Sequence, residues 1–182
     1  MKKPVRRGLP ERHDISDEDR RFMQMAIDLS IENVRQGGGP FGAVVVRDGK
    51  VLATGVNRVT SLCDPTAHAE VSAIRAACAA TGEFHLKGAT VYSSCEPCPM
   101  CLSALYWANV ARICYGNTKE DAKAIDFDDQ FIYDQLDLPY QFIYDQLDLP
   151  YEDRSIRCEH FMGDEAIKAF RLWADKDDKI PY

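Results

Sequence analysis

Residues 89–115, ATVYSSCEPCPMCLSALYWANVARICY, contain a strand, a helix and a second strand in direct succession. The apolar and β-branched residues 89–93 predict the first strand, and residues 110–115 predict the second. Between them, residues 97–109 predict a helix whose first turn is rich in proline, where proline costs no hydrogen bond. Strands joined through a helix are parallel, with a right-handed crossover. This unit predicts an α/β domain.

The flanking segments continue the alternation of strands and helices. Ser16 begins a segment that resembles a helix capping box, and Asp48-Gly49 predicts the two-residue turn of a hairpin. Asp64 and Pro65 predict the N-cap and the first residue of another helix. The other expected elements are a helix that ends before residue 37, strands 41–46, 51–57 and 155–161, and helices 64–80 and 163–176. We expect a three-layer α/β/α sandwich with a central mixed five-stranded sheet.

The composition limits the class of protein. The chain has 182 residues, of which 46% are hydrophobic, which suffices for one domain with its own core. It contains no apolar run long enough for a transmembrane helix, and no apolar signal segment follows its charged start. Seven cysteines in a chain of this size favour reduced thiols. We therefore expect a cytoplasmic protein with no membrane partner.

The charge is divided unevenly along the chain. The net charge is −7, but residues 1–12 alone carry +4, so the remainder carries −11. An acidic body repels polyanions, which disfavours nucleic acid as a partner. We expect residues 1–15 to form a flexible basic tail and residues 16–182 to form one domain.

An identical 11-residue segment, QFIYDQLDLPY, occurs twice in succession, at residues 130–140 and 141–151. Two units of this length are too short and too few for a repeat protein. A recent duplication or an artefact of the sequence explains them most simply, and an extended lid is the functional alternative. Because an insertion in a surface loop costs little closure entropy, we expect the second copy to loop out on the surface.

Two short segments, HAE at residues 68–70 and PCPMC at residues 97–101, carry the chemistry. One histidine and two cysteines suit a tetrahedral zinc site whose fourth position is open to water, which is typical of catalytic zinc. We expect one catalytic zinc ion per chain, held by His68, Cys98 and Cys101. Glu70 would then carry a proton from the activated water to a substrate nitrogen.

The remaining cysteines and histidines are weaker candidates. Cys95 is the alternative zinc ligand, because Cys95, Cys98 and Cys101 are spaced by three residues. Cys95 precedes the proline that opens the helix, so we expect it to end the strand instead. The other cysteines are expected to be small buried apolar residues, and two of the other three histidines are expected at the surface. These residues are Cys63, Cys78, Cys114 and Cys158, and His13 and His85.

The paired HAE and PCPMC segments resemble the signature of zinc-dependent nucleobase deaminases. Longer stretches of the sequence are similar to the bacterial guanine deaminase branch of the cytidine deaminase-like superfamily. These stretches are GGPFGAV at 38–44, DPTAHAE at 64–70, SCEPCPMC at 94–101, FDD at 127–129 and the terminal Tyr182. The resemblance covers residues 20–182, and the chain departs from it in its basic N-terminal extension and its duplicated segment.

The resemblance implies hydrolytic deamination of guanine to xanthine and ammonia, in a homodimer that is often domain-swapped through the C-terminal tail, here residues 175–182. It also implies roles for six residues. Phe41 borders the purine, Asn57 hydrogen-bonds the base, the Ala69 backbone N–H orients the substrate, Trp107 walls the pocket, Asp129 recognises the base edge, and Tyr182 closes the pocket.

Several alternatives stay open at this point. From the residues alone, Phe41 and Trp107 also fit an ordinary core, and Asp129 also fits one more acid in an acidic run. The same chemistry could act on guanosine, cytosine or adenosine in tRNA. A non-catalytic zinc or nucleotide-binding module is the alternative from another class, and it requires Glu70 to be idle.

Overall fold

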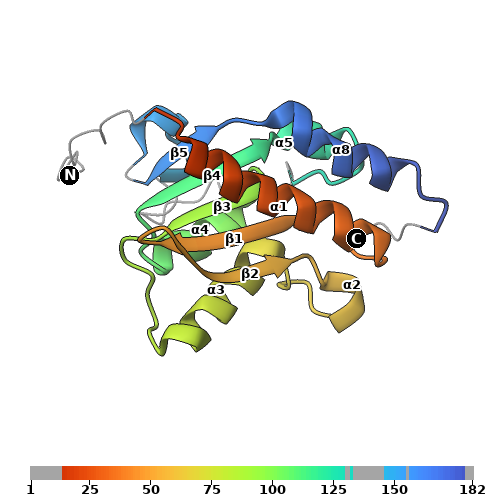
Figure 1. Ribbon diagram of the computed structural model, residues 1–182. Coiled ribbons are helices and arrows are strands. Elements are labelled where there is room, and N and C mark those ends of the chain that lie inside the picture. Colours follow the sequence, from red (N-terminus) through yellow and green to blue (C-terminus); the bar gives the residue numbers. More distant parts are fainter. Residues whose placement is uncertain (1–13, 130–131, 133–145, 155, 179–182) are drawn as a thin grey trace.

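A mixed sheet of five strands, in the order β2-β1-β3-β4-β5, forms the centre of the domain (Figure 1). The structure is a computed structural model, and it describes residues 14–129, 132, 146–154 and 156–178. β1 pairs antiparallel with both β2 and β3, whereas β3, β4 and β5 run parallel. The strands are β1 (Gly42–Arg47), β2 (Lys50–Val56), β3 (Thr90–Cys95), β4 (Arg112–Asn117) and β5 (Arg157–His160).

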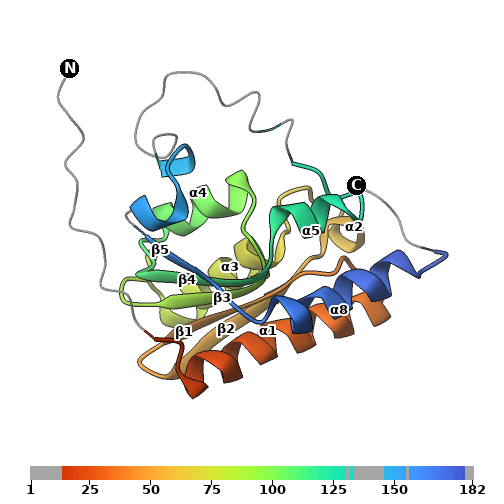
Figure 2. The same ribbon diagram turned by 90° about the horizontal axis from the view of Figure 1, so that it is seen from above.

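Helices cover both faces of this sheet (Figure 2). α1 and α8 lie side by side on one face, and α3 and α4 cover the other. The helices are α1 (Asp17–Arg35), α2 (Val59–Leu62), α3 (Ala69–Thr81), α4 (Pro99–Trp107), α5 (Lys119–Lys123) and α8 (Gly163–Ala174), with a 3₁₀ turn, η1, at Tyr151–Asp153. The expected three-layer sandwich with a mixed five-stranded sheet is confirmed.

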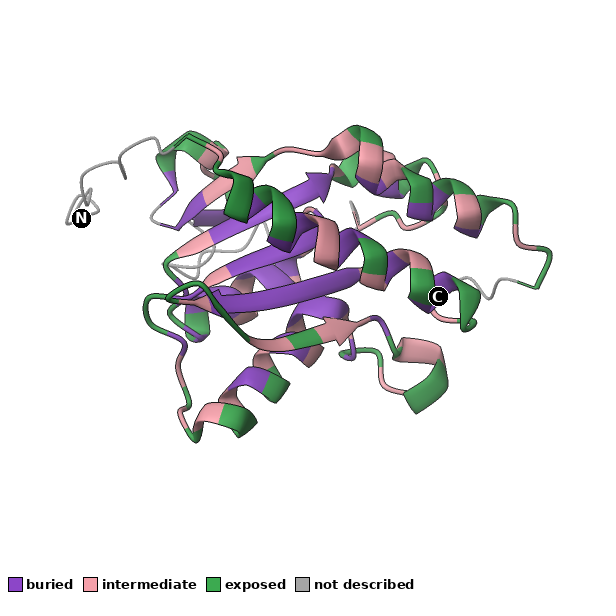
Figure 3. Ribbon diagram, in the orientation of Figure 1, coloured by how far each residue is buried: buried purple, intermediate pink, exposed green. Residues whose placement is uncertain are grey.

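The three inner strands are almost entirely buried (Figure 3). Because helices cover both faces, the side chains of these strands are buried on both faces rather than alternately. The core on the α3 and α4 side includes Val45, Val91 and Ile113, each with no exposed surface. β2 is the partly exposed edge of the sheet.

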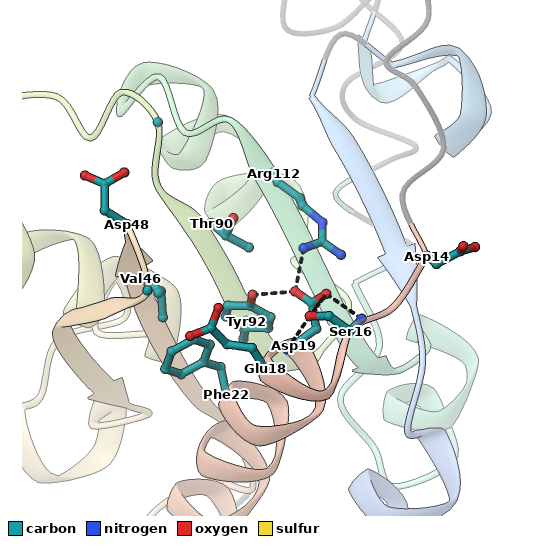
Figure 4. A pocket seen from close by; sticks show the side chains of 12 residues that line it. Asp14, Ser16, Glu18, Asp19, Phe22, Val46, Asp48, Thr90, Tyr92 and Arg112 are labelled. Carbon is teal, nitrogen blue, oxygen red and sulfur yellow. Dashed lines mark hydrogen bonds and ion pairs between the residues drawn. The ribbon is translucent and has the colours of Figure 1, made fainter.

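The start of α1 is tied to the sheet by a buried charge network (Figure 4). Ser16 caps α1 in the expected capping box with Asp19. The Asp19 carboxylate also accepts hydrogen bonds from the Tyr92 hydroxyl at 2.6 Å and from the Arg112 guanidinium at 2.5 Å. Burial alone would raise the pKa of Asp19, but the hydrogen bonds from Arg112 and Tyr92 outweigh it and hold the pKa well below its usual value.

α3 begins four residues later than the Asp64-Pro65 pattern predicts, and this expectation was wrong. The Asp64 carboxylate accepts hydrogen bonds from the backbone N–H and the hydroxyl of Thr66, both within 2.8 Å. Asp64 therefore closes a local turn instead of capping a helix. The N-cap of α3 is His68, whose backbone is extended.

Residues 146–151, the described end of the second copy of the duplicated segment, pack against the domain rather than looping out as expected, and residues 141–145 lie outside the described residues. Leu147 is 8% exposed and belongs to the core beside α4. The Gln146 side chain accepts a hydrogen bond from the Tyr106 hydroxyl at 3.0 Å, and the Tyr151 hydroxyl donates to Glu96. Arg154 donates to the backbone oxygen of Leu147 at 3.1 Å. The end of this copy is therefore packed against the domain. Of the first copy, residues 130–131 and 133–140 lie outside the described residues.

Three further expectations have mixed outcomes. Cys114 is buried as expected, and Cys78 and Cys158 are half-buried, but Cys63 is exposed in a left-handed conformation at the end of α2. His85 is half-buried against the ring of Phe84 rather than fully at the surface. The basic segment 1–13, including His13, and residues 179–182 lie outside the described residues. Within the described part of the chain, no helix combines the length and apolar character needed to cross a membrane.

Candidate active site

Two helix N-termini meet at the candidate site. His68 is the N-cap of α3 and Cys98 is the N-cap of α4, and both have extended backbones. Neither side chain caps its own helix, so the imidazole and the thiol are available to each other. Because His68 stands before the first helical residue, it does not follow helical spacing. Glu70 therefore reaches the same site although it is only two residues away.

Gly55 on β2 positions the start of α3. The backbone of α3 lies so close to this strand that a Cβ on Gly55 would lie 2.3 Å from the backbone oxygen of Ala69. No side chain fits in that space, so glycine allows the first turn of the helix to rest directly on the sheet. The backbone N–H of Arg58 donates to Ala67 at 2.9 Å and fixes the approach to His68.

The three predicted ligands form a triangle of metal-binding dimensions. His68 Nδ1 lies 3.6 Å from Cys98 Sγ and 3.5 Å from Cys101 Sγ. Bond lengths of about 2.05 Å for Zn–N and 2.3 Å for Zn–S at tetrahedral angles place nitrogen and sulfur about 3.5 Å apart. All three ligand atoms lie within 4.8 Å of one another. The donor types and their spacing therefore both fit a zinc ion with three protein ligands.

The electrostatics of the triangle single out Cys98 as the ligand that loses its proton most readily, whereas the hydrogen bond with Cys98 and burial raise the pKa of Cys101. The pKa of the Cys98 thiol is held well below its usual value, because Cys101 and His68 donate hydrogen bonds toward its sulfur. A lowered pKa favours the thiolate form of Cys98, which is the form that binds metal. Burial opposes charge on His68, but its contact with Cys98 outweighs that effect and raises its pKa.

Glu70 is buried next to the triangle, with 6% of its surface exposed. Its pKa is raised, first by burial and second by the negative charge on Cys98. A carboxylate with a raised pKa is a stronger proton acceptor than an ordinary glutamate, as a general base requires. The geometry therefore suits Glu70 to proton transfer beside a metal rather than to metal binding.

Asp129 also lies near the triangle. It interacts electrostatically with both Cys98 and His68. Its pKa is raised to about 6, because the carboxyl group is buried and close to the negative Cys98. The fold thus brings together five predicted residues from three separate stretches of sequence: His68, Glu70, Cys98, Cys101 and Asp129.

Phe41 directly precedes β1, Asn57 directly follows β2, and Ala69 begins α3 next to His68. The backbone N–H of Asn57 donates to the backbone oxygen of Phe41 at 3.2 Å, and the Asn57 side chain is buried. The Phe41 ring packs edge-on against Phe127 at 5.0 Å between centroids. Ala69 is the first residue of α3, where a backbone N–H has no partner within the helix.

Two predicted site residues are not brought to the triangle by the described chain. Trp107 lies at the far end of α4, about 13 Å along the helix axis from Cys98, and is 76% exposed. Tyr182 lies outside the described residues. Cys95 ends β3 as expected, and its sulfur contacts the backbone oxygen of Thr118 instead of the triangle.

One polar contact of the site escapes sequence reasoning. The hydroxyl of Ser93 on β3 donates a hydrogen bond of 3.0 Å to Oε1 of Glu70, and both residues are buried. The signal that could have revealed it is the pair of serines inside an otherwise apolar strand. A serine buried there requires a hydrogen-bond partner.

Comparison with known proteins agrees with this geometry. The family model described as the cytidine and deoxycytidylate deaminase zinc-binding region matches residues 16–117. The guanine deaminase of Bacillus subtilis is 43% identical over 88% of this chain and 97% of its own length. A tRNA-specific adenosine deaminase of Agrobacterium fabrum is 40% identical over 58% of this chain and 69% of its own.

Solved structures lead to the same family. The crystal structure of the Bacillus subtilis guanine deaminase has a TM-score of 0.62 and 42% identity, covering 90% of this chain and 98% of that one. The structure of NE0047 in complex with 2,6-diaminopurine has a TM-score of 0.73 and 27% identity, covering 94% of this chain and 89% of that one. With its zinc-binding triangle and its buried glutamate, this chain is a hydrolytic deaminase that belongs to the cytidine and deoxycytidylate deaminase zinc-binding family.

Proposed function

We propose that this enzyme deaminates guanine to xanthine and ammonia, using one zinc ion per chain. The observation that carries the proposal is the triangle of His68, Cys98 and Cys101 with the buried Glu70 beside it. When bound there, zinc supplies Lewis-acid activation of water near neutral pH. Overall, the amino-bearing carbon of guanine gains an oxygen from water, and its C–N bond breaks to release ammonia.

The residues of the chain transfer the proton and bind the substrate. Glu70 accepts a proton from the attacking water and delivers it to the leaving nitrogen. The Ala69 backbone N–H orients the substrate, and Asn57 hydrogen-bonds the base. Phe41 borders the purine ring, and Asp129 recognises its polar edge. A site that hydrogen-bonds one base rejects others strongly, because the wrong base leaves buried polar groups unpaired.

Three lines of support favour guanine over other substrates. The Bacillus subtilis guanine deaminase matches 88% of the chain, whereas the tRNA-specific relative from Agrobacterium fabrum matches 58%. A structural neighbour holds 2,6-diaminopurine, a purine that carries an amino group at the same ring position as guanine. The net charge of −7 also disfavours a tRNA substrate.

We further propose a cytoplasmic homodimer in which residues 175–182 close an active site, with Tyr182 completing the pocket. Residues 16–182 would form a single catalytic domain after a basic tail. If the tail crosses to the partner, mixing Glu70→Gln subunits with subunits that lack residues 180–182 restores activity. No recovery after verified subunit exchange would place the tail in its own chain's site.

The test of substrate is ammonia release from guanine, guanosine, cytosine and a tRNA with adenosine at the reactive position. Guanine is expected to have the highest kcat/KM, and Asp129→Ala is expected to lower it. Guanosine turning over ten times faster than guanine would contradict the proposal and favour a nucleoside deaminase. Zinc binding without ammonia release from any of the four would favour a non-catalytic zinc module.

A further inference from the structure

The carboxylate of Glu70 has one neighbour that the proposed chemistry does not use. Glu70 is the second residue of α3, and Ser93 lies on β3 in the centre of the sheet. The Ser93 hydroxyl donates to Glu70 Oε1 at 3.0 Å, and its residue is only 2% exposed. A buried hydroxyl on the central strand of the sheet therefore contacts the reactive carboxylate.

We propose that Ser93 is a positioning residue for Glu70. The inference rests on the proposed role of Glu70 as the proton carrier. A glutamate side chain has three rotatable bonds, so its two oxygens must be held if one is to face the water and the substrate. The hydrogen bond from Ser93 fixes Oε1 against the sheet, which in this proposal leaves Oε2 as the oxygen that carries the proton.

The neighbouring serine provides the comparison. Ser94 has no exposed surface, but its hydroxyl accepts a hydrogen bond from the backbone N–H of Gly42 at 3.0 Å. Two adjacent buried serines of one strand thus have different partners: one holds the proton carrier and the other ties β3 to β1. Loss of the Ser94 hydroxyl removes a structural hydrogen bond that is as deeply buried as the one from Ser93, but it leaves the contacts of Glu70 unchanged.

The functional consequence of losing the Ser93 contact falls on turnover rather than on substrate binding. Proton transfer depends steeply on the position of the carboxylate, and a displacement of about 1 Å can cost about 10²-fold in rate. The metal ligands and the substrate contacts are unchanged by it. The expected signature is a lower kcat with an unchanged KM and an unchanged zinc content.

The decisive experiment compares Ser93→Thr with Ser93→Val in the zinc-loaded enzyme. Threonine and valine have the same shape and differ in the hydroxyl alone, so packing strain affects both variants equally. Ser93→Thr is expected to exceed Ser93→Val in kcat by at least about tenfold, with KM values within about threefold of each other. The matched pair Ser94→Thr and Ser94→Val is expected to differ by less than about twofold in kcat.

A second measurement does not depend on activity. The difference in thermal stability between Ser93→Thr and Ser93→Val is expected in the parent protein and absent when Glu70 is alanine, because the partner of the hydroxyl is then gone. A difference that persists without Glu70 would overturn the inference, as would equal kcat values for the two Ser93 variants. Equal kcat values together with an inactive Glu70→Gln enzyme would leave the proposed function intact and remove only the role of Ser93.

Discussion

Replacing Leu147 by alanine tests which copy of the duplicated segment packs against the domain. Leu147 is 8% exposed and packs in the core beside α4. Leucine-to-alanine changes at buried positions cost about 2–5 kcal/mol, and we expect about 2–3 kcal/mol at this nearly buried site. For a domain of this size, that corresponds to a loss of about 5–10 °C in Tm.

The matched control is the same change in the first copy, Leu136→Ala. One leucine fills the buried position, so Leu136→Ala is expected to cost less than about 0.5 kcal/mol. Urea unfolding of the zinc-loaded proteins measures both values. If the two copies exchanged freely, each single variant would lose only about 0.4 kcal/mol, since the intact copy would take the buried position. Small losses in both single variants, with a large loss in the double variant, would refute the packing described here.

Three further predictions concern the metal ligands, the packing of the first turn of α3 on Gly55, and the charge network around Asp19. Metal analysis is expected to show that Cys98→Ala abolishes stoichiometric zinc binding and that Cys95→Ala retains it. The opposite result would show that Cys95, and not Cys98, is the zinc ligand. Gly55→Ala is expected to weaken zinc binding and to cost about 1–3 kcal/mol, because its Cβ would meet the backbone oxygen of Ala69; an unchanged zinc titration would contradict this. The pKa of Asp19 is lowered, so its carboxylate stabilises the fold above its unfolded pKa of about 3.9, and this stabilisation is lost as the pH falls below that value. Asp19→Asn is expected to cost about 3 kcal/mol at pH 6 and clearly less at pH 3 in urea unfolding, and an equal cost at both pH values would contradict the network.

The sequence predicts the order of strands and helices well, because the apolar runs and turn residues act locally. It predicts the start of α3 poorly. Asp64 and Pro65 are favourable at a helix start, but the same two residues also suit the turn that Asp64 closes onto Thr66. Only the tertiary contact of α3 with Gly55 decides where the helix begins.

The metal ligands could be predicted because their residue types and spacing are themselves the chemical requirement. The two serines of β3 indicate that a buried hydroxyl needs a partner, but the sequence does not identify Glu70 as that partner, because it is 23 residues away. The sequence also does not indicate which copy of the duplicated segment packs against the domain, because the two copies are identical. The second copy is the one that lies close to Arg154 in the sequence. Arg154 reaches the backbone oxygens of Leu147 and Leu149.

The central claim is that Glu70 transfers protons beside a zinc ion held by His68, Cys98 and Cys101. The most direct test is the kcat for guanine of Glu70→Gln, measured together with its zinc content. Glutamine preserves the shape of the side chain but cannot carry the proton. We expect about one zinc per chain and a kcat at least about 10²-fold below that of the parent enzyme. A zinc-loaded variant with a kcat near the parent value would contradict the account.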